Sequence, residues 1–373
     1  MAEKSSADFR SFWMGGFECS THRRRDGKRL DVLASSGHDV HAATDYRLLA
    51  DHGMRTVRDG IRWHLIEPSP GSYDFTSLLP MVRAAHDTGT QVIWDLFHYG
   101  YPDDLDIFSP AFVDRFARLA GAVAQLIHDE TGTTPYYVPI NEISFYTWVA
   151  GDVGAFFPFQ HGRGFELKGQ LVRATIAAIE AIRAVDSHAR IAVAEPLINI
   201  QPRSDEAADI VSALRYTDAQ FEAVDFLAGK ARPELGGGPQ YLDIVGLNFY
   251  NRNQWVDMAP PVMVGDPRYV PLSELLARVA ARVERPLFIA ETGNEGDARA
   301  PWLRYVAGEV FAARAAGINV EGICLYPILS HLGWDDDRHC PNGMFEAFGP
   351  DWPRTVDEPL AAELTRLEAL RCE

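Results

Sequence analysis

Two glutamates occupy similar places in the sequence, each at the end of a short apolar run. Glu142 lies in the run 136–143, which reads YYVPINEI, and Glu291 ends the run 286–291, which reads PLFIAE. Burial of a carboxylate costs free energy unless the group is paired, so a glutamate at such a place is a candidate for chemistry. Two carboxyl groups break a glycosidic bond when one protonates the leaving oxygen and the other acts at the anomeric carbon. The two residues are therefore predicted to be catalytic, as acid/base and nucleophile.

The elements that would position these residues alternate along the whole chain. Strands are predicted at 12–19, 56–63, 91–98, 136–143, 190–195, 241–250, 286–291 and 320–326. Helices are predicted at 42–52, 78–88, 110–129, 166–185, 205–228, 272–283, 301–316 and 358–370. The strands are nearly continuous apolar runs, as expected when both faces are buried. This alternation predicts an α/β fold, a single (β/α)8 TIM barrel over residues 1–373. A doubly wound sheet is the alternative, but no glycine-rich phosphate loop follows the first strand.

In such a barrel the carboxyl ends of all the strands meet at one face, where barrel enzymes keep their active sites. Glu142 on the fourth strand and Glu291 on the seventh would then face each other across the barrel mouth. A carboxyl separation of about 5–5.5 Å would make one of them a nucleophile, and a wider gap would admit a water molecule.

Composition and net charge limit the classes of binding partner that the protein can have. The 373 residues carry a formal net charge of −17, which argues against a nucleic acid or an anionic membrane as partner. The N-terminus lacks an apolar leader and no stretch approaches about 18 apolar residues, so a cytoplasmic protein without a membrane span is predicted. Four scattered cysteines at positions 19, 324, 340 and 372 indicate free thiols. His331, His339 and Cys340 are too irregularly spaced to predict a metal site, and no cofactor is expected. The oligomeric state is not defined by the sequence.

Several motifs together resemble glycoside hydrolase family 1 and its relatives in the clan of retaining glycosidases. The resemblance runs from Trp13 to about Phe345. The matching residues are Arg58 and Trp63 of the second strand, His98 of the third, the pair Asn141-Glu142, the run Asn248-Phe249-Tyr250, and Glu291.

The resemblance implies a role for each residue. Glu142 would be the acid/base, its pKa raised by burial and by the neighbouring negative charge, and Glu291 the nucleophile. Arg58 and Tyr250 would hold Glu291 ionised by hydrogen bonds. The remaining predicted substrate-binding residues are Asn141, for the sugar 2-hydroxyl, His98, for a ring hydroxyl, Asn248, Tyr326 and Trp334, the last as a platform for the sugar face.

The departures from the family pattern concern the eighth strand and the loop after it. The family's Trp-Ser-Leu is replaced by Tyr326-Pro327-Ile328. Its Asn-Phe-Glu-Trp, whose glutamate grips the 4- and 6-hydroxyls of the sugar, is replaced by a run from His331 to Trp334 in which Gly333 stands for the glutamate. The acidic residues at 335–337 are candidates to replace the lost carboxylate, although a solvated acidic loop is the simpler interpretation. The family's first-strand glutamine is not evident, and Glu18 and His22 lie near that place. The basic run 23–25 is expected in an exposed loop, and Glu195 is either a wall of the site or a paired structural acid.

Three functions remain open from the sequence. The first is a retaining β-glycosidase that hydrolyses a small β-glycoside by double displacement through a glycosyl-enzyme. The second is a transglycosidase that uses the same two glutamates, and the third is an inactive sugar-binding barrel. The retained Glu142, Glu291, Arg58 and Tyr250 argue against the third. The sequence does not define the sugar or the aglycone.

Overall fold

Eight parallel strands form a closed barrel in the computed structural model, which describes residues 9–347 and 351–372. Around the barrel the strand order is β1-β10-β9-β7-β5-β4-β3-β2. The strands are β1 (Trp13–Gly16), β2 (Thr56–Gly60), β3 (Gln91–Asp95), β4 (Tyr136–Val138), β5 (Arg190–Pro196), β7 (Ile244–Asn248), β9 (Leu287–Thr292) and β10 (Val320–Leu325). Each contains part of one predicted strand, so the predicted TIM barrel is confirmed.

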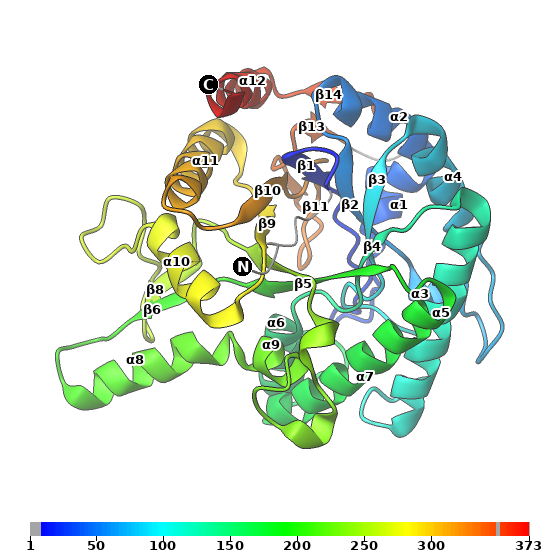
Figure 1. Cartoon of the computed structure of the whole chain (residues 1–373), viewed down its shortest axis with the longest axis horizontal. Helices are drawn as coiled ribbons and strands as arrows, with labels where there is room; N and C mark the ends of the chain where they lie inside the picture. The colour runs from blue at the N-terminus through cyan, green and yellow to red at the C-terminus, as the bar shows by residue number, and fades with distance from the viewer. Residues whose placement is uncertain (1–8, 348–350, 373) are drawn as a thin grey trace.

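Helices surround the strands (Figure 1). The larger ones are α2 (His38–Asp51), α4 (Leu79–Thr88), α5 (Pro110–Thr131), α7 (Gly164–Val185), α8 (Ala207–Ala219), α9 (Glu222–Leu227), α10 (Leu272–Val283), α11 (Arg299–Ala315) and α12 (Glu358–Cys372). Helix α5 shows the usual sequence signals for the start and end of a helix: proline lies in its first turn, and Gly132 caps its end in the left-handed conformation. Its buried residues Phe112, Phe116, Leu119 and Val123 follow the helical period and belong to the large hydrophobic core.

The barrel interior is a separate small core. It is filled by one or two side chains from each of seven strands and by Tyr326, which directly follows β10; its members are Met14, Ile93, Tyr136, Val138, Ala192, Ala194, Ile244, Phe288, Ala290, Cys324 and Tyr326. Phe9 packs on this core against Tyr136 and Phe288, with ring centroids 5.0 and 5.4 Å away. A filled interior of this kind means that the barrel is no pore, and it leaves space for a ligand only at the rim.

Short elements interrupt the loops between strands and helices. The helical ones are α1 (Val32–Ser36), α3 (Trp63–Ile66), α6 (Ile143–Tyr146), a π-helical turn (Thr147–Asp152), and the 3-10 turns Pro233–Leu235, Pro239–Tyr241 and Gly296–Ala298. The extended ones form three two-stranded ladders: β6 (Asn199–Gln201) with β8 (Gln254–Val256), β11 (His331–Leu332) with β12 (His339–Cys340), and β13 (Phe345–Glu346) with β14 (Thr355–Val356).

The second strand was predicted too long, and this changes the place of Trp63. The strand ends at Gly60, and Trp63 begins α3 instead. The indole is fully buried against Phe112 and Phe116, and its Nε1 donates a 2.7 Å hydrogen bond to Glu67. Trp63 therefore has a structural role in this chain.

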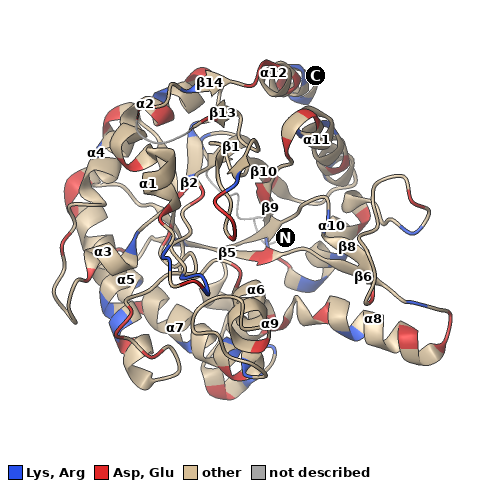
Figure 2. Cartoon of the chain, turned by 180° about the vertical axis from the view of Figure 1, so that it is seen from behind, with Lys and Arg blue, Asp and Glu red and all other residues tan. Residues whose placement is uncertain are grey.

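The predicted helix at 205–228 is also wrong as one element, because it divides into α8 and α9. Gln220, at the break, accepts a hydrogen bond from the backbone N–H of Ile198 and donates to the carbonyl oxygens of Ile198 and Thr217. These contacts tie the end of α8 to the segment before β6. Helix α8 itself projects away from the barrel (Figures 1 and 2), and among its residues only Ala213 is buried.

Charged residues of both signs are interspersed along the outer helices (Figure 2). None of the helices described is long and apolar enough to cross a membrane. The four cysteines form no disulfide: Cys19, Cys324 and Cys340 are buried and Cys372 is exposed.

Candidate active site

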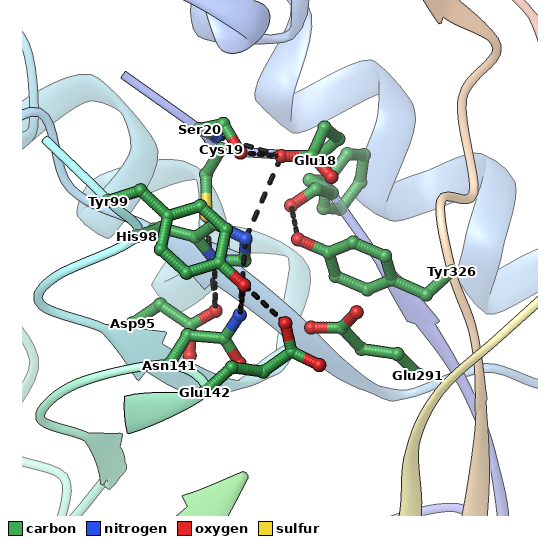
Figure 3. A network of polar contacts seen from close by, with 12 residues as sticks. Glu18, Cys19, Ser20, Asp95, His98, Tyr99, Asn141, Glu142, Glu291 and Tyr326 are labelled. Atoms are coloured by element: carbon green, nitrogen blue, oxygen red, sulfur yellow. Dashed lines mark hydrogen bonds and ion pairs between the residues drawn. The ribbon is translucent and has the colours of Figure 1, made fainter. Parts of the chain in front are cut away.

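A cleft of about 1060 Å³ opens where the carboxyl ends of the strands meet. Its lining includes both predicted catalytic residues, Glu142 and Glu291. Figure 3 shows their carboxyl groups pointing toward one another across the floor of the cleft. Two carboxyl groups far apart in the sequence thus share one concave site, the arrangement that carboxylate-based hydrolysis requires.

Glu142 does not lie at the end of its strand, which is a correction to the prediction. Strand β4 ends at Val138, and Glu142 is the residue before α6. The backbone nevertheless stays attached to both neighbours: the N–H of Asn141 donates at 3.0 Å to Phe97, just after β3, and that of Glu142 at 2.8 Å to Ala194 on β5. These two bonds explain why the sequence of this segment resembles a longer strand.

The backbone of Glu142 is left-handed, with φ of 47°. Only glycine adopts this region without strain, and other residues pay about 1–2 kcal/mol. Tyr99, which follows the third strand, is also left-handed, with φ of 68°, and its hydroxyl donates a hydrogen bond to Glu142 Oε2. Two strained residues in direct contact indicate a position that the surrounding structure fixes.

The environment of Glu142 favours its protonated form. Burial raises the pKa of Glu142 from 4.5 to about 8, the negative charge of Glu291 adds to the rise, and the hydrogen bond from Tyr99 lowers it. A carboxyl group with this pKa carries its proton at neutral pH, as a general acid must.

Glu291 has a different set of partners. Its Oε1 accepts a 3.0 Å hydrogen bond from Arg58 Nη1, and its Oε2 accepts a 2.9 Å bond from the hydroxyl of Tyr250. The two predicted contacts are therefore present. Burial raises the pKa of Glu291, while the charge of Arg58 lowers it. Because Glu291 contacts a guanidinium and the hydrogen-bond donors to Glu142, Tyr99 and Asn248, are uncharged, the proton shared by this pair belongs on Glu142.

Arg58 is fully buried and joins the site to the barrel interior. Its Nη2 donates to Asp95 at 2.7 Å and to Asn141 Oδ1 at 3.1 Å, and its Nη1 also donates to the carbonyl of Ala290. Burial lowers the pKa of Arg58, but the charges of Asp95 and Glu291 outweigh it and hold the pKa well above its usual value. The guanidinium is thus a permanent positive charge that fixes Glu291 in place.

Asn141 connects Arg58, which holds Glu291, with Tyr99, which holds Glu142. Figure 3 shows the side chain of Asn141 beside that of Glu142. Its Oδ1 accepts from Arg58 and from Asn248 Nδ2, at 3.4 Å, and its Nδ2 donates to the hydroxyl of Tyr99 at 3.0 Å. The His98 ring is anchored on the other side, with Nδ1 3.1 Å from Asp95 Oδ2 and Nε2 3.3 Å from Asn141 Nδ2.

The predicted substrate-binding residues therefore fall into two groups. Tyr250, Tyr326 and Trp334 line the cleft. The second group is not part of the lining and lies buried beneath it; its members are Arg58, His98, Asn141 and Asn248. Tyr326 lies over Arg58, with the guanidinium carbon 5.3 Å from the ring centroid, and its hydroxyl donates to the carbonyl of Phe17.

Two residues of the site were given no role from the sequence. Tyr99 directly follows His98 in the sequence, but only its left-handed backbone and its hydrogen bond to Glu142 reveal its place. Glu18 is buried, lines the cleft, and accepts hydrogen bonds at Oε1 from the backbone N–H and the hydroxyl of Ser20. The signal that could have found Glu18 is its position near the carboxyl end of the first strand, since Glu142 and Glu291 also lie near the carboxyl ends of theirs.

The acidic run after Trp334 divides between two environments. Asp335 and Asp336 are exposed and line the cleft, close to Gly333. Asp337 accepts hydrogen bonds from Arg24 and Lys28 at 2.9 and 2.7 Å, so it closes this loop against the basic loop near residue 25.

The role of Glu195 is structural positioning. The residue is buried on β5, and its Oε2 accepts a 3.0 Å hydrogen bond from the backbone N–H of Ser144, in the first turn of α6. Burial raises the pKa of Glu195 to about 7. It does not line the cleft, so its effect on Glu142 passes through the backbone that follows Glu142.

One group of potential metal ligands was found in the described part of the chain: Cys19, Asp95 and His98, all buried and with ligand atoms within 4.8 Å of one another. Asp95 already pairs with Arg58, whose positive charge opposes a cation there. Burial raises the pKa of Cys19 to about 12, which disfavours the thiolate that a metal needs. These residues therefore fit a hydrogen-bonded support for the site better than a metal centre.

Comparison with known proteins gives the fold of the whole chain. The family model described as Beta-galactosidase (Glyco_hydro_42) matches residues 35–95, and no curated protein sequence matches the chain. The AHE enzyme from Alicyclobacillus herbarius is similar in structure, with a TM-score of 0.78 at 16% identity, over 99% of this chain and 100% of that one.

Family 1 β-glucosidase from Thermotoga maritima is similar to the same degree, with a TM-score of 0.78 at 15% identity, over 98% of this chain and 99% of that one. The structure of the β-glucosidase from Thermotoga maritima in complex with deoxynojirimycin gives 0.77 at 16% identity, with 98% and 99% covered. The likeness extends over the full length of both chains. The protein therefore has the (β/α)8 fold of these structures.

Proposed function

We propose that this protein is a retaining β-glycosidase that hydrolyses a small β-glycoside. One observation carries the proposal: two glutamates face each other in one cleft, and their surroundings divide the proton between them unequally. Glu142 is buried without a cation, and Glu291 is held by Arg58 and Tyr250. A pair of carboxyl groups with separated proton affinities is the arrangement of an acid and a nucleophile.

The first half of the reaction forms a glycosyl-enzyme. Glu291 attacks the anomeric carbon as Glu142 transfers its proton to the glycosidic oxygen, so the C–O bond to the aglycone breaks and the aglycone leaves as a neutral alcohol. Charge moves from Glu291 to Glu142 in this step. Arg58 stabilises the negative charge on Glu291 before the attack, and the hydrogen bond from Tyr99 stabilises the negative charge on Glu142 after the proton transfer.

In the second half, Glu142 acts as base. It removes a proton from water, which attacks the anomeric carbon from the side the aglycone left, and Glu291 is released as a carboxylate. Two inversions give net retention of configuration. The mechanism requires the two carboxyl groups to lie about 5–5.5 Å apart, which a crystal structure with a bound sugar would measure.

The sugar would be held from two sides. Glu18 provides an acceptor for hydroxyl groups at the cleft floor, and Trp334 provides an apolar face. Trp334 packs against Phe145 and Tyr99, with ring centroids 6.2 and 5.7 Å away, so its position is well supported.

A panel of aryl β-glycosides, assayed with and without an added alcohol acceptor, tests the proposal. Release of the free β-sugar in water supports hydrolysis with retention. Transfer of the sugar to the alcohol with little hydrolysis would instead identify a transglycosidase, and binding without turnover would identify a sugar-binding barrel.

A further inference from the structure

The outer part of the cleft has an unusual lining of aromatic side chains. Phe145, Trp148, Phe165, Tyr216 and Trp255 all border it. Three of them are far from buried: Trp148 is 46% exposed, Phe165 58% and Tyr216 40%. Transfer of a large aromatic side chain out of water is favourable, so the concentration of such side chains at the rim of one cleft marks a binding surface.

This aromatic rim lies on the side of the cleft where the leaving group must be. If Glu142 protonates the glycosidic oxygen, the aglycone departs beside Glu142. Phe145 is three residues further along, on α6, and Trp148 follows in the π-helical turn. Their rings lie 6.0 Å apart at an angle of 42°. The first surface that an aglycone meets is therefore aromatic.

The other side of the rim comes from distant parts of the chain. Tyr216 lies on α8 and Trp255 on β8, and the two rings meet edge to face at 5.7 Å. Arg252, also exposed and part of the lining, adds a guanidinium plane, a group that stacks on aromatic rings.

Several polar side chains on the same walls are already occupied. The Asn253 amide donates to the carbonyls of Leu197 and Asn248, and Lys168 pairs with Glu222 at 2.6 Å. Gln220 is bound to the backbone of Ile198, before α8, and of Thr217, in α8. A second sugar has many hydroxyl groups that lose hydrogen bonds to water on binding and need replacements. An aromatic group has no such requirement.

From these observations we infer that the aglycone is an extended planar aromatic group, of two or more fused rings, and that the aromatic rim is its binding site. The inference rests on the proposed function only for which side of the cleft the aglycone occupies. The cleft is large enough, since about 1060 Å³ exceeds the volume of most single small-ligand sites.

The test compares 2-naphthyl and phenyl β-glycosides of the same sugar, which have leaving groups of similar acidity and differ in ring area. We expect kcat/KM to be at least about tenfold higher for the naphthyl glycoside. Trp148→Ala and Tyr216→Ala should each lower that ratio by about three- to tenfold, the effect of one lost aromatic contact. Leu214→Ala is the matched control, because Leu214 is 60% exposed on the same helix as Tyr216 and is not part of the lining.

Binding of free 2-naphthol, followed by tryptophan fluorescence, separates this inference from the proposed function. If no glycoside is hydrolysed but 2-naphthol binds and Trp148→Ala weakens binding, the aromatic rim stands and the glycosidase proposal fails. If glycosides are hydrolysed but the naphthyl preference is absent, or is unchanged in both rim variants, the inference is overturned and the glycosidase proposal stands.

Discussion

Tyr99 and Glu142 are hydrogen-bonded to each other, and both have left-handed backbones, with φ of 68° and 47°. Neither is glycine, so each position carries a conformational cost that the fold must offset. The result is a carboxyl group aimed at Glu291 with one phenolic donor and no cation. This pair of residues fixes the position of the Glu142 carboxyl group, while burial and the charge of Glu291 keep it protonated.

Tyr99→Phe tests that role. Because the hydrogen bond from Tyr99 stabilises the Glu142 carboxylate, its loss should raise the pKa of Glu142 further. A hydrogen bond to a charged group contributes about 1.5–3 kcal/mol, which corresponds to a shift of about one to two pH units. We expect the basic limb of the kcat/KM profile to move up in pH by about one unit. Tyr101→Phe, in the same loop, should leave the limb in place; an unchanged limb in Tyr99→Phe would contradict the assignment.

The pH profile of the unmutated protein follows from the same group. Activity requires protonated Glu142, so kcat/KM should fall as the pH rises through about 8. In Glu142→Ala, assayed with a substrate whose leaving group needs no protonation, this basic limb should disappear. A limb near pH 8 that persists in Glu142→Ala would show that another group controls it.

Stability should show the cost of keeping Glu142 protonated. Between pH 4.5 and about 8 the folded protein keeps a proton that the unfolded chain has lost, so the free energy of unfolding falls as the pH rises across this window. Glu142→Gln removes the titration. The Tm gain of Glu142→Gln over the unmutated protein should therefore be larger at pH 8 than at pH 5. Glu274→Gln, at an exposed position on α10, is the control; an equal gain at both pH values would refute the explanation.

The protein should discriminate weakly between sugars that differ in configuration at the 4-hydroxyl, because Gly333 supplies no carboxylate to bind that group. The missing charge-assisted hydrogen bond corresponds to about 1.5–3 kcal/mol. We expect kcat/KM for glucosides and galactosides to lie within about tenfold of each other. A preference of about a thousandfold would mean that another acid has replaced it, and Asp335→Asn and Asp336→Asn would then identify it. Asp337→Asn serves as control, since Asp337 is held by Arg24 and Lys28.

The fold and the floor of the site follow from the sequence to different extents. Apolar runs and helix signals are local properties, so the eight barrel strands could be located and their closure into a barrel predicted. The position of Glu142 beyond its strand could not be predicted, because it depends on hydrogen bonds to Phe97, after β3, and to Ala194 on β5. The contact of Arg58 and Tyr250 with Glu291 came from motif resemblance, and the structure has both bonds.

The aromatic rim depends on contacts between distant segments, which local sequence patterns do not predict. Trp148 lies close to Glu142 in the sequence and could be noticed as a flanking aromatic. Tyr216 and Trp255 could not, because they belong to a helix and a strand that leave the barrel and meet only in the folded chain. The division of the predicted helix at Gln220 has the same origin, a side chain that binds the backbone of a distant segment.

The stereochemistry of azide rescue tests the central claim most directly. Glu291→Gly should lose turnover and regain it with added azide, which enters the vacated space and gives the α-glycosyl azide. Glu142→Ala should still form the glycosyl-enzyme from substrates with good leaving groups, and azide should then attack from the opposite face and give the β-glycosyl azide. Opposite configurations from the two variants are the predicted result. The same configuration from both would contradict the assignment of Glu142 as acid/base and Glu291 as nucleophile.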